Sequence, residues 1–246
     1  MKMDHCEIDA VTTPHAPGRF DIYAGIHKAL RTLMADTLMA LGRADPDDVA
    51  EVSAVSGRVL ELMDVCTAHV VHENHFIHTA IEARATGASA ALAHEHEEHL
   101  AQIARLKTAV SALCQHAGHP ESAAAAHGLY RELALFVAHN YQHMHVEETA
   151  HNCVLWARYT DAELIDLHHR LVASIPPAEM MHTLRWLLPS LNPAERTALL
   201  QDMRAQAPAP AFQAVLDLVQ PHLSGQEWRK LTRSLNLAPV PGLVAG

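Results

Sequence analysis

The chain has 246 residues, 49% of them apolar, so it is long enough to bury a sizeable core and apolar enough to fold as a globule. Its formal net charge is −10 and it has no stripe of Lys and Arg, which argues against nucleic acid and anionic membrane surfaces as partners. Aromatic residues make up only 4%, and alternating β-branched runs are missing, so the composition favours an all-α fold.

Hydropathy along the chain predicts a protein without a membrane span. No apolar run approaches the ~18 residues that a transmembrane helix needs. The first twenty residues lack the apolar segment of a secretory signal, and none of the four cysteines belongs to a CxxC pair. We therefore expect a cytoplasmic protein.

Helix-breaking residues divide the first two thirds of the chain into four long predicted helices. The first stops at Gly42, and in the following "ADPDD" Asp45 suits an N-cap and Pro46 a first helical position. The approximate bounds of these helices are 20–41, 45–85, 89–117 and 120–159. Because the connections are short, consecutive helices should be antiparallel neighbours. The pattern predicts an up-down-up-down four-helix bundle.

Shorter helices are predicted after the bundle. Capping boxes at Thr160/Glu163 and Ser224/Glu227, and a capping Asn192, mark three of their starts. Their approximate bounds are 160–174, 178–188, 193–205, 211–222 and 224–235. The predicted organisation is a flexible segment 1–18, the bundle 19–159, a helical appendage 160–237 and a flexible tail 238–246. We expect the appendage to pack on the bundle or on a protein partner.

The stretch "HVVHENHFIH" in the second predicted helix packs four histidines and one glutamate into ten residues. An α-helix turns about 100° per residue, so the direction of each side chain can be derived. His69 and Glu73 fall inside the apolar stripe, roughly 40° apart. His75 and His78 point away from that stripe, and we expect both to lie on the solvated surface.

The fourth predicted helix repeats this arrangement. His143 and Glu147 lie one turn apart on its apolar line, whereas His145 and Glu148 point well away. His139 lies one turn before His143 and could reach the same cavity.

The other two long helices each direct histidine inward. His27 interrupts the mostly apolar line of the first helix, one turn after Tyr23. His96 and His99 both lie on the apolar line of the third helix, whereas His94 does not. His99 could be an extra ligand, an alternative to His96, or a residue that contacts a ligand.

Each long helix therefore contributes at least one inward histidine, and two helices add a glutamate. A lone inward histidine is usually a satisfied core residue, but buried carboxylates without partners are costly. Imidazoles and carboxylates that converge in this way suit two divalent metal ions bridged by the carboxylates. The two halves would provide equivalent ligands, as in di-metal bundles. The candidate ligands are His27, His69, Glu73, His96, His143 and Glu147.

The order His27, "HVVHE", "EHEEH" and "HMHVE" on successive helices resembles the hemerythrin-like, HHE cation-binding family over roughly residues 20–157. The resemblance implies a non-haem di-iron centre with an open position for dioxygen, nitric oxide or peroxide. Zinc or manganese could also occupy such a site.

The pattern departs from that of the oxygen-carrying hemerythrins. Their third helix has HxxxH, but here Leu100 follows His96 by four residues; their fourth has HxxxxD, but here it is HxxxE. The sequence is closer to the four-histidine, two-glutamate branch, which includes sensors and iron-centre repair proteins. The N-terminal CxxC of many repair proteins is missing.

Three hypotheses follow from this resemblance. The first is a di-iron protein that binds or senses dioxygen, nitric oxide or iron. The second is an enzyme that uses the same centre as a peroxidase, oxidase or nitric-oxide reductase, or in iron-centre repair. The third is a closed zinc site that only stabilises the bundle. We prefer the first, because the sequence shows no substrate pocket and no cofactor fingerprint.

Overall fold

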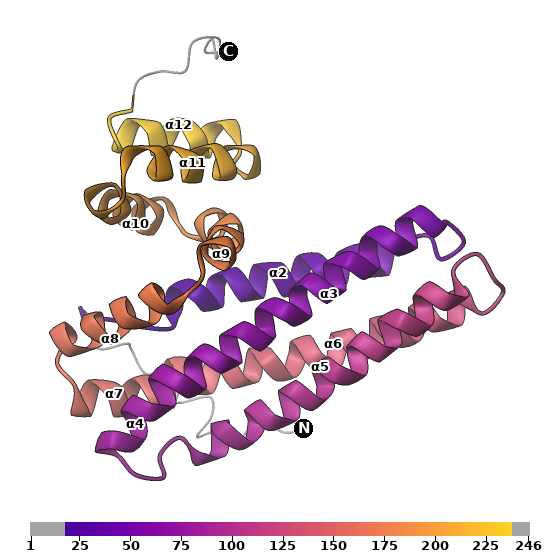
Figure 1. The fold of residues 1–246 in the computed structure, drawn as a ribbon, viewed down its shortest axis with the longest axis horizontal. Coiled ribbons are helices and arrows are strands. Elements are labelled where there is room, and N and C mark those ends of the chain that lie inside the picture. The colour runs from indigo at the N-terminus through magenta and orange to yellow at the C-terminus, as the bar shows by residue number, and fades with distance from the viewer. Residues whose placement is uncertain (1–17, 238–246) are drawn as a thin grey trace. The chain divides into compact units, whose positions relative to one another are not determined.

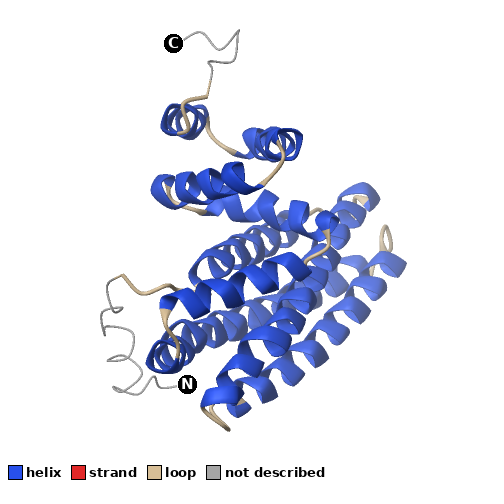
Figure 2. Ribbon diagram, turned by 60° about the vertical axis from the view of Figure 1, so that its left-hand side comes forward, coloured by secondary structure: helices blue, strands red, loops and turns tan. Residues whose placement is uncertain are grey.

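The computed structural model describes residues 18–237 of the chain, so the predicted flexible segment 1–18, apart from Gly18, and the predicted tail 238–246 lie outside the described residues. Within the described range the chain forms helices and no strand (Figure 2), which confirms the predicted all-α class. Contacts divide the chain into two compact units. One contains the residues up to His27 and Leu33–Ser174, and the other Lys28–Thr32 and the residues from Ile175 on.

Four long helices form the predicted bundle, and consecutive helices run in opposite directions (Figure 1). They are α2 (Ala24–Arg43), α3 (Val49–His72), α5 (Ala90–His116) and α6 (Ser122–Val146). Each helix buries a line of large apolar side chains, for example Met34, Leu62, Leu106 and Leu133. Removing this apolar surface from water is the main contribution to the stability of such a core.

Two of the long helices continue through a π-helical segment. After α3 come η1 (Glu73–His78) and α4 (Thr79–Arg84), and after α6 come η2 (Glu147–His151) and α7 (Asn152–Arg158). Both π segments begin at a predicted glutamate ligand. A π turn is wider than an α turn and is often found at functional sites, because it changes the direction of the side chains that follow.

The start of α3 differs from the prediction. Asp48 caps the helix, and its carboxylate accepts hydrogen bonds from the backbone N–H groups of Ala50 and Glu51. Asp45 and Pro46 lie before this cap, in the turn. Each aspartate of "ADPDD" has the side chain of a good N-cap, so local sequence could not decide among them.

Replacing the capping Asp48 with alanine is expected to lower the free energy of unfolding of the bundle by about 1 kcal/mol, because two backbone N–H groups lose their acceptor. Chemical denaturation followed by circular dichroism measures this loss. Asp47→Ala is the matched control, since this neighbouring aspartate does not cap the helix. Equal losses in the two variants would contradict the assignment of the cap.

Helix α8 (Asp161–Ser174) packs with the bundle unit. Its Leu164 and Leu167 are buried in a cluster that includes Ile77, Ile81 and Leu155. The predicted capping box at its start is present, because the Thr160 N–H donates to Glu163 Oε2 and the Glu163 N–H donates to Thr160 Oγ1. Through Ile81 of α4 and Leu155 of α7, the apolar cluster joins α8 to the segments that follow both π turns.

The second unit has its own apolar core. Its helices are α9 (Pro177–Ser190), α10 (Pro193–Gln206), α11 (Ala209–Val219), the 3₁₀ turn η3 (Gln220–His222) and α12 (Gly225–Ser234). Leu188, Leu200, Leu216 and Leu231 are buried in this core. Asn192 caps α10 and Ser224 with Glu227 forms a capping box at the start of α12, as the sequence predicts. At Asn192 the structure adds Glu195, which completes a second capping box.

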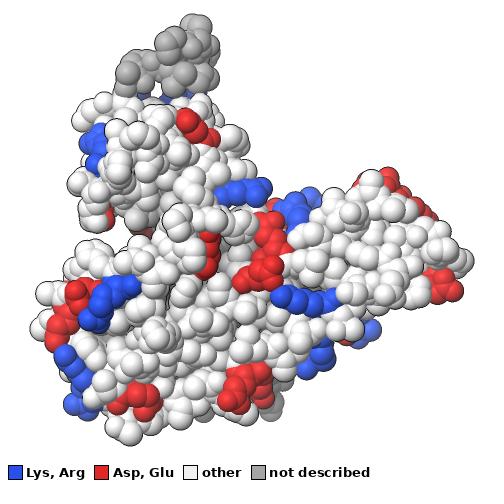
Figure 3. Space-filling view, viewed as in Figure 1, with Lys and Arg blue, Asp and Glu red and all other residues white. Residues whose placement is uncertain are grey.

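Charged side chains of both signs are scattered over the face shown in Figure 3, between larger areas of other residues. Ion pairs among the described residues include Arg19–Asp161 and Arg84–Glu163. Among the described helices, none combines the length and the apolar character that crossing a membrane requires.

Candidate metal centre

The six candidate ligands lie together inside the bundle. His27 comes from α2, His96 from α5 and His143 from α6, while His69, Glu73 and Glu147 lie where α3 and α6 meet their π segments. The His69 side chain is 14% exposed, and the other five are at most 5% exposed. Among the six candidate ligands, His69 is therefore the most accessible to solvent.

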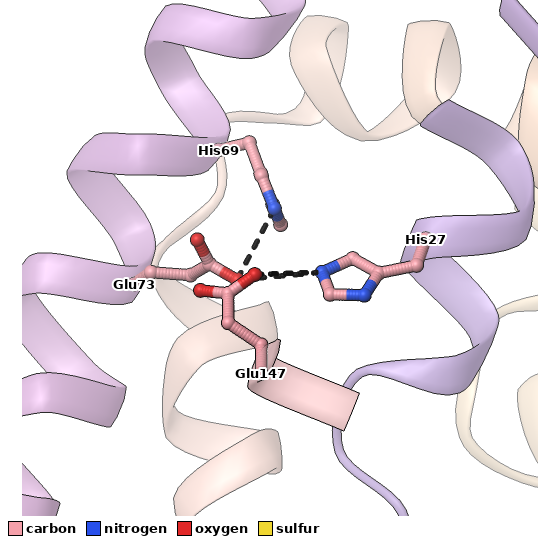
Figure 4. Close-up of side chains that lie close together, drawn as sticks. All are labelled: His27, His69, Glu73 and Glu147. Carbon is pink, nitrogen blue, oxygen red and sulfur yellow. Dashed lines mark ion pairs between the residues drawn. The ribbon is translucent and has the colours of Figure 1, made fainter. Parts of the chain in front are cut away.

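One half of the cluster joins His27 and His69 to the two glutamates (Figure 4). His69 Nε2 lies 3.1 Å from Glu73 Oε1. His27 Nε2 lies 3.6 Å from the same oxygen and 3.5 Å from Glu147 Oε2. These four residues each offer one donor atom, and the atoms lie within 4.8 Å of one another, so a single cation between them could contact all four.

The other half joins His96 and His143 to the same glutamates. His96 Nε2 lies 3.4 Å from Glu73 Oε2, and His143 Nε2 lies 3.3 Å from Glu147 Oε1. The two Nε2 atoms are 2.9 Å apart. Because both glutamates belong to both halves, each carboxylate is placed to bridge two cations.

Donor atoms without partners show that the cluster fits metal ions. His27 Nε2, His69 Nε2 and all four carboxylate oxygens of Glu73 and Glu147 are buried without a hydrogen-bond partner. Buried polar atoms are normally satisfied, and each unsatisfied one costs about 1–3 kcal/mol. Metal ions bound in the two halves would satisfy them, and mixed imidazole and carboxylate donors suit iron, zinc or manganese.

The opposite ring nitrogens of three candidate ligands are held by polar partners. The pairs are His27 Nδ1 with Glu148 Oε1 at 3.0 Å, His96 Nδ1 with Asn74 Oδ1 at 2.8 Å, and His143 Nδ1 with Glu95 Oε2 at 2.7 Å. Such partners fix the ring so that Nε2 faces the cluster. The prediction that Glu148 points well away is wrong, because its carboxylate reaches His27.

Removing one of these partners should weaken metal binding without removing a ligand. We expect Glu95→Ala to lower metal affinity about 10–100-fold, because the His143 ring loses the group that orients it. Competition with a chelator of known affinity measures the change. Glu97→Ala is the matched control, since the Glu97 side chain is 80% exposed. An unchanged affinity in Glu95→Ala would contradict this role.

Burial and the facing charges act in opposite directions on the pKa values of the cluster. Burial by itself would lower the pKa of His27, but Glu148, Glu73 and Glu147 together raise this pKa to about 9. Burial would likewise lower the pKa of His143, but Glu147 and Glu95 raise it to about 9. Burial would raise the pKa of Glu73, but His69, His27 and His96 hold it well below its usual value. Metal binding would therefore displace protons from these imidazoles.

The prediction that His78 lies on the solvated surface is wrong. Its side chain is buried, and its ring stacks on that of His96 with centroids 4.8 Å apart. Five residues of α-helix would place His78 about 140° from Glu73. The wider turns of η1 reduce this angle to roughly 50°, which brings the ring inward. Burial lowers the pKa of His78 to about 4.

His151 is a buried residue of the cluster that the sequence analysis missed. It lies in η2, and its ring contacts that of His78. The spacing offered a signal, since His143, Glu147 and His151 follow one another at four-residue intervals.

The other residues considered as ligands or as surface histidines differ in how far they are buried. His99 is buried and its ring lies 4.7 Å from that of His143, but it belongs to none of the candidate metal groups among the described residues. His139 is exposed and pairs with Gln102, so it does not reach the cavity. His75 and His94 are exposed, as predicted. Tyr23 is buried and stacks on His27.

The fold and the cluster together define a class: a four-helix bundle whose core contains paired histidine and carboxylate groups that could hold metal ions. Residues 20–151 match the model of the Hemerythrin HHE cation binding domain, which is more than half of the chain. The chain belongs to this hemerythrin-like family. Comparison with curated proteins and with solved structures found no match.

Proposed function

We propose that this protein holds two iron ions in a non-haem centre and uses them to bind or sense dioxygen, nitric oxide or iron itself. The observation that carries the proposal is the pair of donor groups that share Glu73 and Glu147. Iron accepts mixed imidazole and carboxylate donors, and when bound it supplies redox and ligand-binding chemistry that the side chains lack.

The surroundings of the centre support a small ligand. Only His69 among the six residues has substantial exposure, 14% of its side chain. The other five candidate ligands are buried in the core, and this surrounding favours a small ligand over a large substrate. The chain's own contribution is to orient the imidazoles and to keep bulk water from the donors.

Iron loading tests the first part of this proposal. When metal-free protein is given two equivalents of ferrous iron without oxygen and then desalted, we expect both ions to be retained. His69→Ala should retain fewer than one, because its Nε2 faces the shared Glu73 oxygen at 3.1 Å. The control is His94→Ala, since His94 is 71% exposed. Retention of both ions by His69→Ala, or none by the wild type, would contradict the proposal.

Spectra of the loaded protein separate binding from catalysis. On exposure to air, nitric oxide or peroxide, a stable absorption change that reverses when the ligand is removed supports binding or sensing. Continuous consumption of the added oxidant with a reductant present would favour the enzyme alternative. Tight retention of a single zinc ion in place of iron would favour a purely structural site.

A further inference from the structure

A second group of donors lies at the edge of the centre. His78, His151 and Glu147 each offer one ligand atom, and these atoms lie within 4.8 Å of one another. All three residues are buried. Neither histidine is among the six candidate ligands, and their rings meet edge to face with centroids 5.3 Å apart.

His78 is a buried histidine whose ring nitrogens both lack a partner. Its side chain is 5% exposed, and neither ring nitrogen has a hydrogen-bond partner. Its ring lies parallel to that of His96, at an interplanar angle of 3°. Stacking accounts for the faces of the ring but leaves both buried nitrogens unsatisfied, which is unusual for polar atoms in a protein core.

The His151 ring has a polar partner at its Nδ1 atom. Its Nδ1 lies 3.4 Å from the Tyr23 hydroxyl. Metal-binding imidazoles are usually oriented by such polar partners. The two histidines come from equivalent places in the two halves of the bundle, since one lies in η1 and the other ends η2.

We propose that His78, His151 and Glu147 form a third cation site, which takes a divalent first-row transition-metal ion. This third site goes beyond the proposed function, and the only residue that it shares with the six candidate ligands is Glu147. A carboxylate has about four lone-pair positions, so Glu147 can serve this ion as well as the pair of ions in the centre. Two imidazoles with one carboxylate are a donor set found for zinc and ferrous iron, whereas magnesium and calcium prefer oxygen alone.

Zinc stoichiometry of the full chain tests this site. Metal-free protein is dialysed against excess Zn²⁺, and the number of zinc ions bound per chain is compared between wild type and variants. Zinc on surface histidines is the same in each protein and does not contribute to the difference. His78→Phe keeps a ring that can stack on His96 but removes the donors, and it is expected to bind one ion fewer than wild type. His75→Phe, three positions earlier and exposed, should bind as many ions as wild type.

The outcomes separate this proposal from the proposed function. Equal zinc contents in wild type and His78→Phe would overturn the third site, even if both hold the two ions of the centre. If wild type and His78→Phe differ by one ion, the third site is supported whatever the content of the centre. Should circular dichroism show that His78→Phe is unfolded, His151→Phe provides the same comparison from the other helix.

Discussion

Replacing Glu147 with glutamine is expected to abolish stable metal binding in both halves of the centre. Its carboxylate oxygens lie 3.5 Å from His27 Nε2 and 3.3 Å from His143 Nε2, so both halves depend on it. Glutamine is nearly the same size but removes the charge and one acceptor oxygen. Loss of a buried charged partner costs about 3–5 kcal/mol, which corresponds to a roughly 100–1,000-fold or greater loss of affinity.

Thermal unfolding with and without added metal measures this effect. A ligand at 100 times its dissociation constant stabilises the folded state by about 2.7 kcal/mol, so metal should raise the melting temperature of the wild type. The increase should vanish in Glu147→Gln. The adjacent Glu148→Gln is the control, because Glu148 contacts the outer nitrogen Nδ1 of His27, and this substitution should weaken binding by about 10–100-fold. An equal increase in wild type and Glu147→Gln would contradict the shared role of this carboxylate.

Replacing Arg196 with methionine is expected to unfold the second unit. The Arg196 side chain is 2% exposed, and its guanidinium donates to the backbone carbonyls of Leu188, Pro189 and Leu191. Those carbonyls end α9, where no intrahelical donor remains. Each one left unsatisfied costs about 1–3 kcal/mol, and a unit of this size is stabilised by only ~3–9 kcal/mol.

Tryptophan fluorescence can follow the second unit alone. The three tryptophans are Trp156 in the bundle unit and Trp186 and Trp228 in the second unit, so a Trp156→Phe background removes the bundle signal. In that background Arg196→Met should lose the cooperative urea transition, while Arg233→Met, at an exposed position of α12, should keep it. Metal content should not change, because all six candidate ligands lie in the bundle unit. A transition like that of the parent would contradict the role of Arg196.

The sequence was sufficient for much of the fold and of the site because the helices are regular up to the glutamates. His69 to Glu73 and His143 to Glu147 are each one α-helical turn, so ordinary helical geometry predicts that each pair shares a face. Capping residues such as Thr160, Asn192 and Ser224 are also local signals, and the structure confirms them. The structure brings all six candidate ligands together; that they bind metal stays a prediction.

What the sequence could not provide depends on departures from regular helix and on neighbouring elements. The inward turn of His78 requires a π segment, for which the local sequence gives no distinct signal. Glu148 reaches a histidine on another helix, and this contact depends on how α2 and η2 pack. His151, in contrast, lies at a spacing that helical geometry could have detected.

Anomalous diffraction at the iron edge, from crystals of protein loaded with two equivalents of ferrous iron per chain, tests the central claim most directly. We predict two peaks roughly 3.5–4 Å apart, the usual spacing of a two-metal site. One should lie against His27 and His69 and the other against His96 and His143, and both should contact Glu73 and Glu147. A single peak, or peaks only on surface histidines such as His75 and His94, would show that these carboxylates do not bridge two metal ions.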